Sequence, residues 1–254
     1  MNKVLLRRLA YIVTAIVAVI VAVVVIVGIV HRLENRDLGT RMVTVTVIPG
    51  STINTIAKSL SRLGLPSQSF LKLALPTFGS STTTSGTQPG LEGYLYPDTY
   101  YFASDESADR IVKTMVANFD IHFPRDLFDN QRGTVRSRDD IVIMASILEK
   151  EVAKEEDRRI VSGILWKRLD ERLPLGVDST VHYFLVPPKG VVYNTYQDTG
   201  LPIRPISNPS LDSIRAALEP KATDYWYFLS AHDGTTVYSR TLGEHLINKA
   251  KYIE

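Results

Sequence analysis

Residues 137–155, SRDDIVIMASILEKEVAKE, combine the signals of an α-helix with one carboxylate, Glu149, that could serve as a general acid. Ser137 and Asp140 have the spacing of a capping box. Apolar residues then recur at the spacing of one buried helix face, namely Ile141, Ala145, Leu148 and Val152. Glu149 lies at the margin of that face, where partial burial favours the protonated carboxyl group that a general acid needs. From the helix alone, a solvated helix-edge glutamate paired with a nearby lysine is the simpler interpretation.

The elements that would position this helix mix helices with short strands, which predicts an α+β fold. Alternating valines at 43, 45 and 47 indicate a half-buried strand that ends at Pro49-Gly50. Residues 173–225 are rich in Pro, Asn, Asp, Ser and Tyr, which indicates long ordered loops of the kind that often carry function. The other expected elements are helices at 51–64, 67–74, 107–118, 160–169, 210–218 and 242–252 and a hairpin of 225–229 with 236–238.

The first thirty residues differ in composition from the rest of the 254-residue chain. Residues 9–30 carry no charge and are long enough to cross a hydrocarbon layer of about 30 Å as a helix. Lys3, Arg7 and Arg8 precede this run, and positive residues favour the cytoplasmic side. These features predict a single-pass signal anchor in the cytoplasmic (inner) membrane, with the N-terminus inside and the rest of the chain extracytoplasmic. A cleavable signal peptide is the competing interpretation, although no A-x-A-like cleavage site is present.

The predicted domain organisation follows from these segments. It comprises a cytoplasmic stub at 1–8, a transmembrane anchor at 9–30, a linker at 31–42, a small module at 43–78, a Ser/Thr/Gly-rich linker at 79–90 and a large domain at 91–254. The strand and two helices of the small module bury too little surface to be stable without a neighbour. The segment at 79–90 is predicted to be a flexible linker or, alternatively, a loop that covers a substrate.

The composition excludes several classes of function. The formal charge of +2 includes the basic residues ahead of the apolar run, so the remainder is close to neutral, which argues against nucleic acid as a partner. The absence of cysteine excludes disulfides and a thiol nucleophile. The sequence has no P-loop, GxGxxG, GxSxG or HExxH motif. The five histidines lack the spacing of metal ligands, so no metal site is expected.

Residues 91–102, LEGYLYPDTYYF, place a cluster of aromatic side chains beside Glu92 and Asp98. Aromatic clusters of this kind usually belong to a hydrophobic core. Aromatic faces beside carboxylates also suit sugar rings, which offer an apolar CH face and a rim of hydroxyl groups. The residues alone leave both interpretations open.

Four blocks carry a resemblance to a known family: LEGYLYPDTY at 91–100, ASILEKE at 145–151, VYNTYQDTGLPIRPISNP at 192–209 and AALEPKATDYWYFLSAHDGTTVYSRTLGEH at 216–245. In this order they resemble the YceG-like (MltG) family of endolytic murein transglycosylases, over residues 43–254. The resemblance implies a membrane-anchored enzyme that cuts nascent peptidoglycan glycan strands, with a LysM-like module at 43–78. Peptidoglycan synthases are implied partners, and the implied reaction needs no cofactor and no metal.

The resemblance also implies which residues form the site. Glu149 falls on the catalytic glutamate of the family, and the substrate-cleft positions fall on Glu92, Asp98, Asp178, Thr180, Tyr193, Asn194, Thr195 and Tyr196. Where the family commonly has LQxDPT, this chain has LGVDST, and where many members have GLPPGPI it has GLPIRPI. These departures place Gly176, Ser179 and Arg204 where they could alter substrate fit.

In the implied mechanism, Glu149 protonates the glycosidic oxygen between MurNAc and GlcNAc while C1 gains oxocarbenium character. The resulting carboxylate then accepts the proton of the MurNAc C6 hydroxyl, which attacks C1 and leaves a 1,6-anhydro end. Asn194, Thr195 and the Asp178 region would orient the sugar. Two alternatives stay open: a muramidase that uses water, with Asp178 as the second carboxylate, and a membrane-anchored scaffold that binds glycan strands without cutting them.

Overall fold

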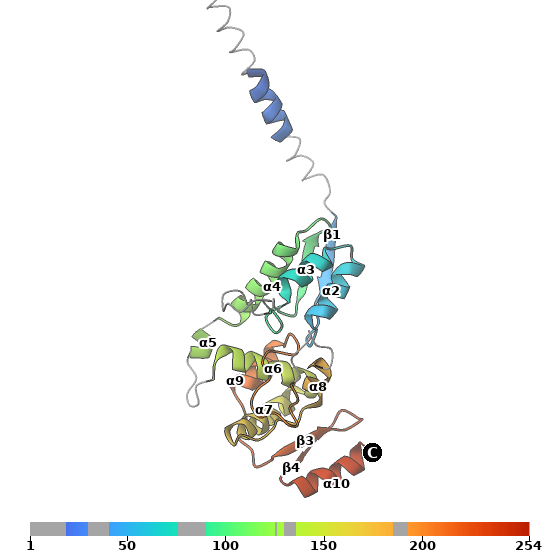
Figure 1. Cartoon of the computed structure of the whole chain (residues 1–254), viewed down its shortest axis with the longest axis vertical. Helices are drawn as coiled ribbons and strands as arrows, with labels where there is room; N and C mark the ends of the chain where they lie inside the picture. The colour runs from blue at the N-terminus through green and yellow to red at the C-terminus, as the bar shows by residue number, and fades with distance from the viewer. Residues whose placement is uncertain are drawn as a thin grey trace, which may run out of the picture. The chain divides into compact units, whose positions relative to one another are not determined.

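The computed structural model describes residues 19–29, 41–75, 90–124, 126–129, 136–184 and 193–253 (Figure 1). The chain divides into two compact units, Met1–Val43 with Ala103–Asp105, and Thr44–Phe102 with Glu106–Glu254. In the first unit, residues 19–29 form a helix. Within the described ranges, no helix is both long and apolar enough to cross a membrane. Residues 9–18 and 30 of the predicted anchor, and most of the linkers at 31–42 and 79–90, lie outside those ranges.

The strand and two helices predicted for the small module are confirmed as β1 (Met42–Thr46), α2 (Ile53–Arg62) and α3 (Ser67–Ala74). The N-cap of α2 is Thr52, one residue later than expected, and its side chain forms a capping box with Thr55. A second strand, β2 (Thr99–Ala103), pairs with β1, and α4 (Ala108–His122) packs against α3. Elements beyond residue 78 therefore complete the core of this module.

The aromatic cluster at 91–102 contains strand β2, which the sequence analysis did not predict. Tyr100 and Phe102 are buried and stack with their ring centroids 5.8 Å apart, whereas Tyr101 is exposed. This alternation is the side-chain pattern of a half-buried strand. The core interpretation of these two rings is therefore confirmed.

Helix α6 (Arg138–Glu151) lies at the centre of the larger unit. The predicted capping box of Ser137 and Asp140 is confirmed, but the helix ends at Glu151 because Val152 adopts an extended backbone. The predicted burial of Ile141, Ala145, Leu148 and Val152 is confirmed, and burial extends beyond that face to every residue from 141 to 148. Three neighbours contact α6: α7 (Glu155–Asp170), α8 (Asp178–Phe184) and α9 (Leu211–Leu218). A helix surrounded in this way is apolar on all sides.

Fully buried Asn208 fixes the long loop that leads into α9. Its Oδ1 accepts hydrogen bonds from the backbone N–H groups of Gly93 at 3.0 Å and Leu95 at 2.9 Å. Its Nδ2 donates to Ser51 O and to Glu92 Oε1, both at 2.9 Å. Both polar atoms of the amide thus have two partners, as a buried polar group requires. One side chain therefore joins the turn before α2, the 91–95 segment and the 201–210 loop.

The C-terminal elements match the prediction closely. Strands β3 (Tyr227–Ser230) and β4 (Thr236–Ser239) form an antiparallel hairpin in which Tyr227 pairs with Ser239 and Ser230 with Thr236. Helix α10 (Leu242–Tyr252) packs against this hairpin (Figure 1). None of its residues is buried, so α10 forms an outer cover of the hairpin. A short helix, α5 (Asp126–Asp129), lies between α4 and α6 in the chain.

Candidate active site

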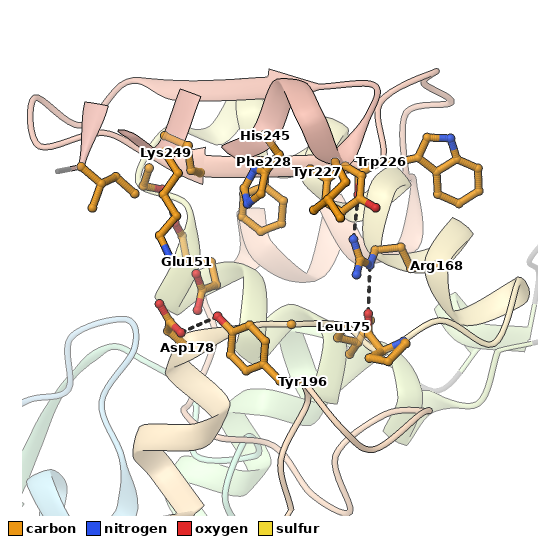
Figure 2. A pocket seen from close by; sticks show the side chains of 16 residues that line it. Glu151, Arg168, Leu175, Asp178, Tyr196, Trp226, Tyr227, Phe228, His245 and Lys249 are labelled. Atoms are coloured by element: carbon orange, nitrogen blue, oxygen red, sulfur yellow. Dashed lines mark hydrogen bonds between the residues drawn. The ribbon is translucent and has the colours of Figure 1, made fainter. Parts of the chain in front are cut away.

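A cleft of about 460 Å³ opens between the C-terminal end of α6, the 174–178 segment, strand β3 and helix α10 (Figure 2). Two carboxylates line it, Glu151 at the last residue of α6 and Asp178 at the first residue of α8. Tyr196 and Phe228 add aromatic surface. Carboxylates beside aromatic rings in an open cleft form a site suited to a sugar chain.

Glu151 is held at its position by two hydrogen bonds from different elements. Its Oε1 accepts from the backbone N–H of Ser179 at 2.9 Å. Its backbone carbonyl accepts from Ser230 Oγ on β3, also at 2.9 Å. The first bond orients the carboxylate and the second fixes the end of the helix, so Glu151 faces the cleft from a rigid position.

Asp178 is oriented by the hydroxyl group of Tyr196, which donates to Oδ1 at 2.6 Å. Figure 2 shows this bond beside the carboxylate of Glu151. Burial raises the pKa of Tyr196, and the hydrogen bond to Asp178 and the negative charges of Asp178 and Glu151 raise it further. The Tyr196 hydroxyl therefore keeps its proton at neutral pH and stays the donor of this hydrogen bond.

Thr180 and Thr195, both predicted to contact substrate, are fully buried behind Asp178. Their hydroxyl oxygens lie 2.8 Å apart, and both donate to the carbonyl of Val177. The N–H of Val177 donates in turn to Thr195 Oγ1 at 3.0 Å. The structure thus gives the two threonines a positioning role, because they hold the segment that carries Asp178 and Tyr196.

Tyr193 and Asn194 shape the turn that presents Tyr196. Tyr193 donates from its hydroxyl to the carbonyl of Gly200 at 2.8 Å. Asn194 Oδ1 accepts from the backbone N–H of Tyr196 at 3.0 Å, and the N–H of Asn194 donates to Asp198. Neither side chain lines the cleft in the described part of the chain. Of the predicted cleft residues, Asp178 and Tyr196 do line it.

Glu149 faces a different part of the larger unit from Glu151. Its Oε2 accepts three hydrogen bonds, from Ser210 N at 2.8 Å, Ser210 Oγ at 2.5 Å and Ser213 Oγ at 2.8 Å. Arg158 lies 3.5 Å from Oε1, and only 7% of the Glu149 side chain is exposed. These contacts tie the end of α6 to the start of α9. The assignment of catalysis to Glu149 stays a prediction, and its geometry is that of a structural group.

Glu92 and Asp98 also lie outside the cleft lining. Glu92 is 3% exposed and accepts hydrogen bonds from Ile53 N, from Asn208 Nδ2 and, at 2.8 Å, from the Tyr183 hydroxyl. Burial raises its pKa to about 7. Asp98 accepts from Thr99 N and from Asn118 Nδ2 at 2.9 Å, which joins β2 to α4. Both carboxylates therefore connect elements of the fold.

The model of the YceG-like family matches residues 25–251. The chain belongs to the YceG-like family. It is similar to the endolytic murein transglycosylase of Bacillus subtilis (strain 168), with 37% identity over 174 residues that cover 64% of this chain and 48% of that protein. The endolytic murein transglycosylase of Streptococcus pneumoniae serotype 2 is 26% identical over 252 residues, which cover 84% of this chain and 45% of that protein.

A solved YceG-like structure also resembles this fold. The crystal structure of a YceG-like protein from Listeria monocytogenes matches with a TM-score of 0.63 and 30% identity, covering 87% of this chain and 80% of that one. The chain spans about half the length of the curated relatives it matches.

Several residues of this YceG-like cleft were not selected from the sequence. Glu151 belongs to the same ASILEKE block as Glu149, and the order of its residues did not show which glutamate faces the cleft. One wall of the cleft consists of aromatic and cationic side chains, and part of it lies within residues 216–245, where no individual site residue was predicted. This wall includes Arg168, Trp226, Tyr227, Phe228, His245 and Lys249. Among the residues that the structure describes, no cluster of His, Asp and Glu is arranged to hold a metal ion.

Proposed function

We propose that this chain is a lytic transglycosylase that cleaves peptidoglycan glycan strands in the cleft of Glu151 and Asp178. The observation that carries the proposal is that two carboxylates, each fixed by a hydrogen bond from a neighbouring element, line one open cleft. The relatives named endolytic murein transglycosylase support the reaction class and the substrate. A glycan strand is long and polar, so it needs an open cleft rather than a closed cavity.

We assign the role of acid and base to Glu151 rather than to Glu149. A catalytic acid must approach the glycosidic oxygen within hydrogen-bond distance. Glu149 is nearly inaccessible, and its Oε2 already accepts three hydrogen bonds. Glu151 lies in the cleft lining, two residues further along the same helix. The block from which the resemblance implied Glu149 as the catalytic residue also contains Glu151.

The reaction needs one carboxyl group that changes its proton state. Glu151 donates its proton to the glycosidic oxygen, and the bond from that oxygen to C1 of MurNAc breaks. The C6 hydroxyl of the same sugar attacks C1 and returns its proton to the Glu151 carboxylate, which leaves a 1,6-anhydro ring. Asp178, oriented by the hydroxyl group of Tyr196, stabilises the positive charge that develops at C1.

A muramidase is the second candidate, and the presence of Asp178 in the same cleft favours it. In that reaction Asp178 activates a water molecule, and the product has a reducing end. Mass spectrometry of fragments released from uncrosslinked strands by the full-length protein in detergent separates the two reactions. Fragments lighter by one water, with anhydro ends, support the transglycosylase, and reducing ends support the muramidase. Strands that stay bound and uncut would support a scaffold.

The proposal extends to the membrane and to partners. Residues 9–30 would anchor the protein in the cytoplasmic membrane, with the cleft outside, and the uncharged composition of this run supports the anchor. Residues 43–78 would act as a LysM-like glycan-binding module, supported by their strand–helix–helix order. Peptidoglycan synthases would be partners. Because the chain lacks cysteine, single cysteines can be placed before and after the anchor and treated with a membrane-impermeant reagent. Only the cysteine after the anchor should be labelled in intact cells, and equal labelling of both would contradict this topology.

A further inference from the structure

One wall of the cleft carries a row of cationic side chains that the proposed reaction does not use. Arg168 of α7 and His245 of α10 both lie against the ring of Tyr227. The guanidinium carbon is 5.1 Å from the ring centroid, and the imidazole stacks on the ring with centroids 5.3 Å apart. Lys249 lies one helical turn after His245, lines the same cleft, and points toward Glu151 and Asp178 in Figure 2. We call Arg168, His245 and Lys249 the cationic row.

Arg168 is fixed by neutral partners. Its Nε donates to the carbonyl of Pro174 at 2.9 Å, and its Nη1 donates to the carbonyl of Trp226 at 3.0 Å. Carbonyl groups orient the guanidinium but leave its positive charge uncompensated. A guanidinium held in one orientation is well prepared to bind a carboxylate.

His245 contributes a buried polar atom. Its Nδ1 is inaccessible to solvent and has no hydrogen-bond partner among the described residues. Burial, together with the positive charges of Lys249 and Arg168, lowers the pKa of His245. An anion bound beside the imidazole would supply a charge that compensates the positive charges of Lys249 and Arg168.

Gly176 leaves space next to the cationic row. Its φ of +61° lies in the left-handed region, which glycine adopts without steric cost. A Cβ at this position would lie 3.5 Å from Tyr196 Cε1 and 4.0 Å from Arg168 Nη2. Because glycine has no side chain, a substituent of a bound sugar can reach the Arg168 guanidinium past the Tyr196 ring.

We propose that the cationic row is a carboxylate subsite that binds an acid group carried by the muramic sugar in the cleft. The proposal rests on the proposed function, which puts that sugar next to Glu151. The muramic lactyl group ends in a carboxylate when the sugar has no peptide, and when the lactyl group is amidated the stem peptide supplies a carboxylate. His245 feels the positive charges of both Lys249 and Arg168, so an anion bound beside it lowers that repulsion.

The test measures binding by the full-length Glu151→Gln variant in detergent, which should bind strands without cutting them. The ligands are a peptide-free GlcNAc–MurNAc tetrasaccharide with free lactyl carboxylates, its neutral lactyl amide, and the tetrasaccharide carrying stem peptides. By calorimetry, the free acid should bind about tenfold more tightly than the amide. If the peptide-bearing ligand binds tightly and the neutral amide binds weakly, the stem peptide supplies the carboxylate. Equal affinities of all three ligands would overturn the subsite.

Variants of α10 assign the effect to the cationic row. Adding His245→Gln and Lys249→Gln to Glu151→Gln should reduce the ratio of acid to amide affinity toward one. Lys251→Gln on the same helix is the matched control, because Lys251 does not line the cleft, and it should keep the ratio. Gly176→Asn, which tolerates the left-handed backbone and fills the gap, should also reduce the ratio. An unchanged ratio in the His245 and Lys249 variant would contradict the proposal.

The proposed function and the subsite fail in different ways. If the wild-type protein does not cut strands but still prefers the acid ligand, the reaction is wrong and the subsite stands. If the wild-type protein cuts strands and shows no preference for the acid, the subsite is wrong and the reaction stands.

Discussion

The backbone N–H of Ser179 donates a 2.9 Å hydrogen bond to Glu151 Oε1, which fixes the carboxylate at the end of α6 beside the first residue of α8. The resemblance described above pairs Ser179 with the proline of the LQxDPT motif, and proline has no N–H to donate. The departure noted in the sequence therefore adds a hydrogen bond to the carboxylate that we assign to catalysis. It also couples Glu151 to Asp178, since Ser179 follows Asp178 directly in the chain.

Removing the Tyr196 hydroxyl should lower activity without unfolding the protein. Tyr196→Phe deletes the 2.6 Å hydrogen bond that orients Asp178. A hydrogen bond to a charged group contributes about 1.5 to 3 kcal/mol, so kcat/KM should fall by at least about tenfold. The melting temperature should stay unchanged, because 55% of Tyr196 is exposed. Tyr101→Phe on β2 is the control, and full activity in Tyr196→Phe would contradict the role assigned to Asp178.

Stability should depend on pH through Glu92. Burial raises its pKa from 4.5 to about 7, so the folded protein holds this proton more tightly than the unfolded chain does. Protonated Glu92 adds to the free energy of unfolding below pH 4.5, and this contribution is lost as the pH rises to about 7. Relative to Glu92→Gln, the wild-type free energy of unfolding should fall by about 3 kcal/mol across that range.

Urea unfolding of the two proteins at a series of pH values measures this difference. Glu219→Gln removes a carboxylate whose side chain is 70% exposed and should show no comparable pH dependence. A wild-type protein that became more stable relative to Glu92→Gln between these pH values would show that the sign is wrong.

Gly163 of α7 is predicted to tolerate no side chain. A Cβ there would lie 2.0 Å from the backbone oxygen of Lys221. That backbone cannot move freely, because Lys221 N donates to Arg159 O at 2.9 Å. Gly163→Ala should therefore lower the free energy of unfolding by about 3 kcal/mol or more.

Thermal unfolding of Gly163→Ala and of a control variant, Gly243→Ala, measures the cost of the close contact at α7. Gly243→Ala in α10 should be neutral or slightly stabilising, since the nearest atom found around its added Cβ is 3.9 Å away. If Gly163→Ala were as stable as Gly243→Ala, the packing of α7 against the 221 segment would be refuted.

Local chemistry made several elements predictable. The capping box of Ser137 and the turn formers between β3 and β4 define their elements through neighbours in sequence, and the structure confirms both. The prediction for α6 had the right start, but its end and its surroundings depend on contacts with α7, α8 and α9. Apolar periodicity cannot show that a helix is buried on every side.

The choice between Glu149 and Glu151 illustrates the same limit for the site. The two residues are two positions apart on one helix, so they face different directions. The contacts that decide which side chain faces the cleft are distant in sequence. Glu149 is covered by Ser210 and Ser213, more than sixty residues away, and Glu151 lies beside the hairpin that carries Ser230. Helix α8, which carries Asp178, was likewise missed among turn-forming residues. The family block contains both glutamates, and the tertiary contacts are the reason why we propose Glu151.

The most direct test compares Glu151→Gln with Glu149→Gln in full-length protein, scored by release of fragments from uncrosslinked strands and by thermal unfolding. Glu151→Gln should fold with an unchanged melting temperature and lose cleavage by at least about a thousandfold, because no other group in the proposed mechanism moves the proton. Glu149→Gln should be destabilised by about 2 kcal/mol and retain cleavage below its melting temperature. A folded Glu149→Gln without cleavage, beside an active Glu151→Gln, would contradict the account.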